Sequence, residues 1–129
     1  MVFLEIVKLL LQDQRTDVNK QDKYGSTPFH VACANGKIEV VKYMMQDQRI
    51  DVNKPDNYGW IPIWIASNRG HSLVVQAILQ SGRNINLDAK YENKTALEQA
   101  RQNGYQDIVN LIENYTKNIY EGEKIIIIK

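Results

Sequence analysis

The chain has 129 residues, 43% of them hydrophobic and 24% charged, and its formal net charge is +1. These values are typical of one compact globular domain, and so small a charge argues against binding to nucleic acid or to an anionic membrane. Since no segment approaches the roughly 20 apolar residues of a membrane span and Cys33 is the only cysteine, we expect a cytoplasmic protein, with the nucleus as the alternative.

The opening segment is predicted to form a helix rather than a secretory signal, because Glu5 and Lys8 interrupt its apolar run. Its residues 4–7 are similar to residues 38–41, which lie 34 residues later. The later segment is preceded by another helical stretch, whereas the opening helix is not. Its apolar flank therefore predicts either a fragment of a longer array or a surface for self-association.

A repeat of 34 residues is the main feature of the sequence. Residues 8–25 read KLLLQDQRTDVNKQDKYG and residues 42–59 read KYMMQDQRIDVNKPDNYG, identical at twelve of eighteen positions. A fixed period of this length indicates stacked units that cannot bury their apolar faces alone. We predict a half repeat over 1–19, repeats over about 20–53, 54–87 and 88–116, and a tail over 117–129.

Each unit is predicted to be a pair of helices joined by a short turn. Residues 27–35 and 37–46 carry apolar side chains at helical spacing, and Gly36 separates them. Pro28 and Pro62 fit the first turn of a helix, where a missing amide donor costs little. Residues 17–25 are rich in Asp, Asn and Gly and predict an extended turn between one helix pair and the next.

This pattern resembles the ankyrin repeat. The resemblance is carried by DKYGSTPFHVAC at residues 22–33, followed by Gly36, Val40-Val41 and Asp51-Val52-Asn53. It covers about residues 1–116 and implies an all-α solenoid of stacked helix-turn-helix units with β-hairpin finger loops. It further implies that the first helices line a concave face, and that variable positions on this face and on the fingers contact protein partners.

The unit that follows departs from the family motif at two linked positions, where Ile61 replaces Thr27 and Trp64 replaces His30. In the family, the Thr and His side chains are understood to hydrogen-bond across the first helical turn. Replacing both partners with apolar groups is close to neutral, whereas losing one leaves the other unpaired. We therefore interpret the pair as a buried contact between Ile61 and Trp64.

The last unit lacks the Pro and His of the motif and is richer in polar residues, which predicts a terminal cap with one face in water. The tail from 117 to 129 has no repeat register and is expected to be flexible. Its run of four isoleucines, 125–128, favours a strand over a helix. The alternative to a flexible tail is a segment that covers an exposed edge or apolar surface.

The sequence offers little evidence for a catalytic or metal-binding site. His30 and His71 have explanations in the repeat pattern, and Cys33 lies at a small inner position with no CxxC or neighbouring histidine. Asp13, Asp17 and their later equivalents recur as turn residues. We therefore predict no enzymatic activity, no catalytic or metal site and no cofactor.

The remaining signal is the variable surface. The positions that change between units occupy the fingers and the ends of the first helices, and Trp60 is favoured because the same position holds Ser26 and Lys94. For Tyr24 and Tyr58 the alternative is stacking between fingers. The predicted contacts to a protein partner are Lys23, Tyr24, Ser26, Asn35, Asn57, Tyr58, Trp60, Asn68, Arg69, Tyr91, Lys94 and Asn103.

The sequence thus predicts a non-enzymatic adaptor or scaffold that binds a protein partner through its concave face and finger loops. A structural or self-associating piece of a larger repeat protein is the alternative, and such a protein can include an enzyme that the repeats regulate. The fold alone names no partner.

Overall fold

The computed structural model describes residues 2–128, and the side chains of residues 3–122. Over this range the chain forms seven helices and no extended strand. In chain order they are α1 (Val2–Gln12), α2 (Pro28–Ala34), α3 (Ile38–Met45), α4 (Pro62–Asn68), α5 (Ser72–Leu79), α6 (Ala96–Asn103) and α7 (Gln106–Ile128). The predicted all-α architecture is confirmed.

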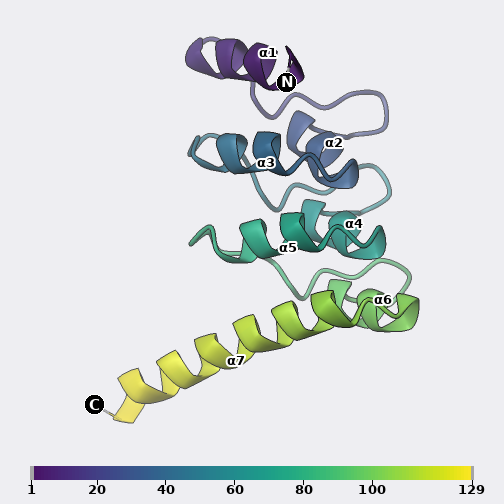
Figure 1. The fold of residues 1–129 in the computed structure, drawn as a ribbon, viewed down its shortest axis with the longest axis vertical. Helices are drawn as coiled ribbons and strands as arrows, with labels where there is room; N and C mark the ends of the chain where they lie inside the picture. The colour runs from purple at the N-terminus through teal and green to yellow at the C-terminus, as the bar shows by residue number, and fades with distance from the viewer. Residues whose placement is uncertain (1, 129) are drawn as a thin grey trace.

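The helices stack as layers along one axis (Figure 1). Helices α1, α3, α5 and α7 form a first column, and helices α2, α4 and α6 form a second column beside it. Among the described residues, helix α1 has no companion from the second column. The loops between layers project on the side of the second column.

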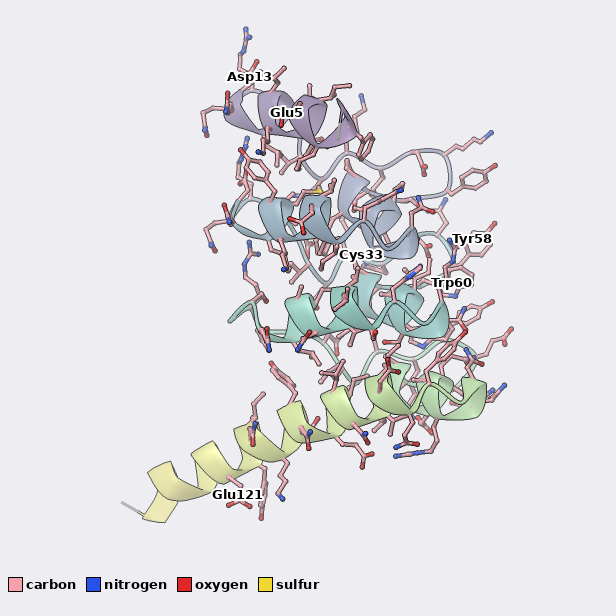
Figure 2. All side chains as sticks on the ribbon, viewed as in Figure 1. Glu5, Asp13, Cys33, Tyr58, Trp60 and Glu121 are labelled. Carbon is pink, nitrogen blue, oxygen red and sulfur yellow. The ribbon has the colours of Figure 1, made fainter. Side chains whose placement is uncertain are left out.

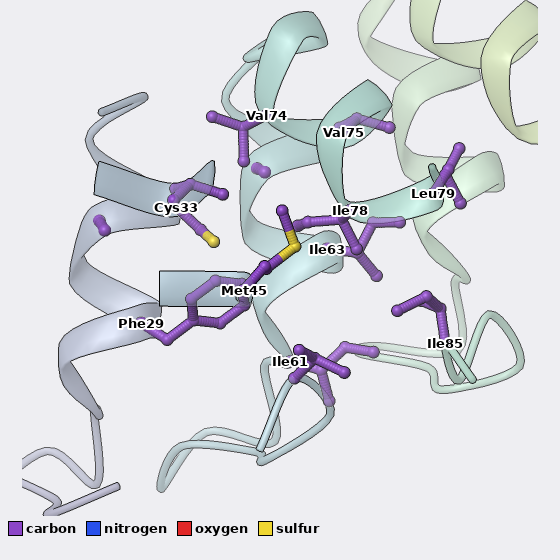
Figure 3. Close-up of a cluster of buried hydrophobic side chains, with 14 of the residues drawn as sticks. Phe29, Cys33, Met45, Ile61, Ile63, Val74, Val75, Ile78, Leu79 and Ile85 are labelled. Atoms are coloured by element: carbon purple, nitrogen blue, oxygen red, sulfur yellow. The ribbon is translucent and has the colours of Figure 1, made fainter. Parts of the chain in front are cut away.

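The core lies between the two columns and runs through every layer. Phe29 and Cys33 on α2, and Ile63 on α4, are almost fully buried. They lie in one cluster with residues of the first column such as Val75 and Ile78 (Figure 3). No single unit encloses these side chains, because each layer covers the face of the next. Stability therefore depends on the contacts between units as well as on each unit.

The finger loops are tight turns of two kinds. In the first two, the aspartates Asp22 and Asp56 each accept two backbone N–H groups through Oδ1, at 2.9 Å. The third loop has Lys90 at this place. There Tyr91 and Lys94 exchange two backbone hydrogen bonds of 3.0 Å around two residues with positive φ, which is the geometry of a type I′ hairpin.

Two arginines tie the layers together at the side away from the fingers. Arg49 donates to the carbonyl of Leu11 at 2.7 Å, and Arg83, one period later, donates to the carbonyls of Met45 (2.9 Å) and Asp47 (2.8 Å). These carbonyls lie at the C-terminal ends of α1 and α3, where no N–H group of the same helix reaches them. A positive charge near the C-terminus of a helix is stabilising. Each arginine therefore caps the helix of the layer before it.

We expect Arg83→Ala to lower the free energy of unfolding by about 2 kcal/mol, because hydrogen bonds from a charged donor to these carbonyls would be lost. Arg15→Ala is the matched control, since Arg15 occupies the same repeat position but is exposed and bonds only to Asp13 among the described residues. Urea unfolding followed by circular dichroism measures both. Equal losses would contradict the capping role.

The prediction of a strand at residues 125–128 is wrong, because α7 continues to Ile128. The first half of the helix is stabilised by packing, because Ile108, Val109 and Ile112 are buried against the stack. Once a helix has formed, each further residue adds a hydrogen bond, and β-branched residues lower helix propensity by less than about 1 kcal/mol each. The predicted boundary at 116 falls inside α7, and the flexibility of the segment beyond it stays a prediction.

Candidate partner-binding groove

A groove runs between the first two finger loops and the short helices α2 and α4. It encloses about 270 Å³. Its lining comes from both fingers and from both helices: Tyr24, Ser26, His30, Val31, Ala34, Asn35, Asp56, Tyr58, Trp60, Ile65 and Arg69. Figure 2 shows Tyr58 and Trp60 on the finger side of the stack. We call this feature the finger groove.

One wall of the finger groove is part of an aromatic cluster of Tyr58, Trp60, Trp64 and Tyr91. The Trp60 ring stacks on Trp64, with centroids 5.7 Å apart and planes 19° from parallel, and meets the edge of Tyr91 at 5.1 Å. Tyr58 lies 5.7 Å from Trp60 on the exposed side. The indole Nε1 of Trp60 is buried without an acceptor among the described residues, so aromatic packing and not a hydrogen bond holds this ring.

Trp64 performs one of the tasks of the histidine that it replaces. His30 Nε2 bonds to the carbonyl of Trp60 at 2.6 Å, and Trp64 Nε1 donates to the carbonyl of Lys94 at 3.0 Å, in both cases 30 residues later. Ile61 makes no side-chain cap, whereas Thr27 accepts from the backbone of His30 at 3.2 Å. The polar contact within the turn is thus lost, and the polar contact to the next unit is kept.

The burial expected of the Ile61 and Trp64 pair is confirmed, since each is 4% exposed. The interpretation of a purely apolar exchange is wrong for Trp64, because its indole N–H holds the Lys94 carbonyl. The same carbonyl also accepts the backbone N–H of Tyr91 at 3.0 Å, so the indole N–H is its second donor and comes from the neighbouring unit.

Arg69 lies at the helix end of the finger groove. Its Nη1 donates to the carbonyl of Ala34 at 3.1 Å, and His71 Nε2 bonds to the same oxygen at 2.9 Å. These bonds hold the guanidinium over the end of α2. The side chain is exposed, and no carboxylate pairs with it in the part of the chain that the structure describes.

The structure brings six of the twelve predicted contact residues together around the finger groove. These are Tyr24, Ser26, Asn35, Tyr58, Trp60 and Arg69. Trp60 is half-buried, because it is packed within the aromatic cluster. Tyr91 belongs to that cluster and not to the groove lining.

The other predicted contacts lie outside the groove, and several connect neighbouring units. Asn57 Nδ2 donates to the carbonyl of Lys23 at 3.1 Å, and Asn103 Nδ2 donates to the carbonyl of Asn68 at 3.0 Å. Lys23 Nζ lies 5.1 Å above the Tyr24 ring, and Lys94 contributes its carbonyl to Trp64. These residues therefore have structural contacts that the sequence pattern did not reveal.

The floor of the finger groove is made by Val31, Ala34 and Ile65. The sequence prediction included Ala34 among the variable positions at the ends of the first helices and missed Val31 and Ile65. Val31 is 43% exposed although it lies on a helix whose neighbouring residues are buried. Its signal in the sequence is the column that it forms with Ile65 and Gln99 at the repeat spacing. An apolar residue at an outward position of a short helix could have indicated this part of the groove.

Reactive groups outside the groove have ordinary structural environments. Burial raises the pKa of the Cys33 thiol well above its usual range, so the thiolate that acts as a nucleophile is disfavoured. Among the described residues no group of three His, Cys, Asp or Glu side chains is arranged to hold a metal ion. None of the described helices is both long and apolar enough to cross a membrane.

Comparison with models of known protein families identifies a match. The family model for ankyrin repeats, in three copies, matches the chain over residues 2–91 and 51–121. These two ranges together extend from α1 into the second half of α7. No curated protein matches the chain.

Proposed function

The chain belongs to the ankyrin-repeat family, and we propose that it is a non-enzymatic adaptor or scaffold that holds a protein partner in the finger groove. Ankyrin repeats are in general protein-interaction modules. The groove supplies the kind of surface that such binding needs: an apolar floor, aromatic side chains at the rim and one arginine. Tyrosine, tryptophan and arginine are the residues that most often dominate binding energy at protein interfaces.

The observation that carries this proposal is the exposure of apolar and aromatic side chains around one concavity. Val31 is 43% exposed and Tyr58 is 58% exposed, and both line the finger groove. Exposed apolar groups gathered around a groove, with polar groups at its edge, are typical of interaction sites.

A pull-down from a cell lysate of the source organism tests the proposal. We expect a double variant, Tyr58→Ala with Arg69→Ala, to retain at least about tenfold less of a specific partner than the intact chain, because two rim residues of hot-spot type are removed. Tyr58 is preferred to Trp60 because truncating the packed Trp60 ring would disturb the aromatic cluster. Leu73→Ala is the control, since Leu73 is exposed on α5 outside the groove lining.

Equal helix content and equal melting temperatures by circular dichroism must accompany the comparison. Equal recovery of the same protein by the intact chain and by the double variant would contradict the proposal. Loss with Leu73→Ala as well would place the contact on another face.

A second candidate function is self-association through α1, and the repeat register favours it. Ile6 is 49% exposed and Leu10 is also exposed, whereas Val40 and Met44, one period later on α3, are almost fully buried under α2. Leu10 and Phe3 line an apolar hollow of about 240 Å³ together with residues of α2 and α3. Two copies of the chain can cover this surface in a symmetric dimer, in which the same patch serves both partners.

If α1 pairs with its copy, sedimentation equilibrium should show a mass that rises from monomer to dimer with concentration. Ile6→Lys with Leu10→Lys should then give a monomer throughout, because two charges would have to be buried in the contact. Glu5→Lys is the control for added positive charge, since Glu5 lies on the exposed side of the same helix. A monomeric mass for the intact chain at all concentrations would contradict self-association.

A further inference from the structure

We propose that the finger groove binds an extended segment of a partner protein in which a carboxylate side chain lies two residues from an apolar side chain. This inference rests on the proposed function and specifies its ligand. The carboxylate pairs with Arg69, and the apolar side chain lies on the floor made by Val31 and Ile65.

The charge of the ligand follows from the state of the two ionic residues in the groove. Asp56 is committed to its own finger, because its Oδ1 accepts the backbone N–H groups of Tyr58 and Trp60 at 2.9 Å. Arg69 uses only Nη1, which donates to Ala34. The edge formed by its Nε and Nη2 has no hydrogen-bond partner among the described residues.

That edge of a guanidinium matches a carboxylate in geometry, because two parallel N–H groups donate to two oxygens. The bond to Ala34 also holds the guanidinium in one place, so less side-chain entropy is lost when an anion binds. A lysine at this position would lack the two parallel N–H groups. The groove therefore selects for an acidic group at its helix end.

The size of the groove excludes larger occupants. A volume of about 270 Å³ lies just below the roughly 300–1,000 Å³ of pockets that hold whole small-molecule ligands. One turn of an α-helix, about 10–12 Å across with its side chains and about 5.4 Å in pitch, takes up more space than this volume. An extended segment fits, with single side chains entering the groove.

The spacing of the two side chains follows from the geometry of an extended chain. Side chains at positions i and i+2 of an extended segment point to the same side. One such pair can therefore direct an apolar group at the floor and a carboxylate at Arg69, while the residue between them faces solvent. The exposed rings of Tyr24 and Tyr58 flank the segment at the finger rim.

The test is selection of peptides from a random dodecapeptide display library on the purified full chain. Enriched sequences are expected to share an apolar residue and an Asp or Glu two positions apart. Fluorescence anisotropy with one enriched, labelled peptide then compares variants. Arg69→Ala should weaken binding about 10- to 100-fold, as expected for loss of a hydrogen-bonded ion pair, and Arg15→Ala, a matched loss of charge at an exposed arginine outside the groove, should leave it unchanged.

Arg69→Gln serves as the second variant, because it removes the charge and keeps a donor for the Ala34 carbonyl, so that the layers stay joined. Arg69→Glu should in turn bind the same peptide more tightly when its acidic residue is changed to lysine. Enriched peptides without an acidic residue, no enrichment at all, or equal affinity for the intact chain and Arg69→Gln would each overturn the inference.

The proposed function is judged separately by the lysate experiment. A partner that is lost with Tyr58→Ala and kept with Arg69→Gln would leave the interaction module in place and overturn the acidic ligand. Loss of the partner with both single variants supports both proposals.

Discussion

Replacing Trp64 with alanine should lower the free energy of unfolding by about 3–5 kcal/mol, the usual cost of removing a buried aromatic side chain. Trp64 is 4% exposed, stacks on Trp60 and contacts the edge of Tyr91 at 5.3 Å. Its loss would open a cavity between two layers and remove the indole N–H from the Lys94 carbonyl, which would keep only the backbone N–H of Tyr91. Urea unfolding followed by circular dichroism measures the loss.

Two further variants separate packing from hydrogen bonding. Trp64→Phe keeps an aromatic ring and removes the indole N–H, so we expect a smaller loss of about 1–3 kcal/mol. The double variant Ile61→Thr with Trp64→His would rebuild the arrangement of Thr27 and His30 and should be more stable than Trp64→His alone, because the histidine Nδ1 then has its neighbour. A loss below about 1 kcal/mol for Trp64→Ala would contradict a packing role.

Trp64 also shows how far the sequence could predict this molecule. The comparison of Trp64 with His30 correctly predicted a buried residue, because the position in the repeat was known. The hydrogen bond to Lys94 was missed, since it joins groups 30 residues apart in neighbouring layers. A pattern within one unit reveals the helices of that unit, whereas contacts between units depend on how the layers stack.

The same distinction applies to the finger groove. The variable positions identified Tyr24, Tyr58, Trp60 and Arg69, because a change in residue type at a fixed repeat position is visible in the sequence. The prediction could not distinguish residues that face the groove from residues such as Asn57, which hydrogen-bonds to the preceding finger. Both kinds vary between units, and only the stacked geometry separates them.

The β-branched run at the end of α7 shows the opposite limit. The composition of residues 125–128 favours a strand, yet the helix that begins at Gln106 continues through them. Propensity is a weak preference that a helix already formed can override. The repeat register, in contrast, acts over the whole stack and was a reliable guide to the fold.

The two finger glycines at equivalent repeat positions should differ in their response to alanine. Gly25 and Gly59 have φ values of +76° and +87°, a region that costs a residue with a Cβ about 1–2 kcal/mol. At Gly59 a Cβ would meet open space, so Gly59→Ala should lower the free energy of unfolding by no more than this strain. At Gly25 a Cβ would lie 2.7 Å from the backbone nitrogen of Asn57 and would also strike its side chain.

Gly25→Ala should therefore cost about 1–3 kcal/mol more than Gly59→Ala, because overpacking is added to the same strain. The backbone nitrogen of Asn57 donates to the Tyr24 carbonyl at 3.0 Å, and this contact holds the first two fingers together. The clash cannot be relieved without moving one finger away from the other.

Since both fingers form one wall of the groove, Gly25→Ala should also weaken partner binding, whereas Gly59→Ala should not. Paired urea unfolding curves measure the difference, and equal losses for the two variants would show that the fingers are not in contact in solution.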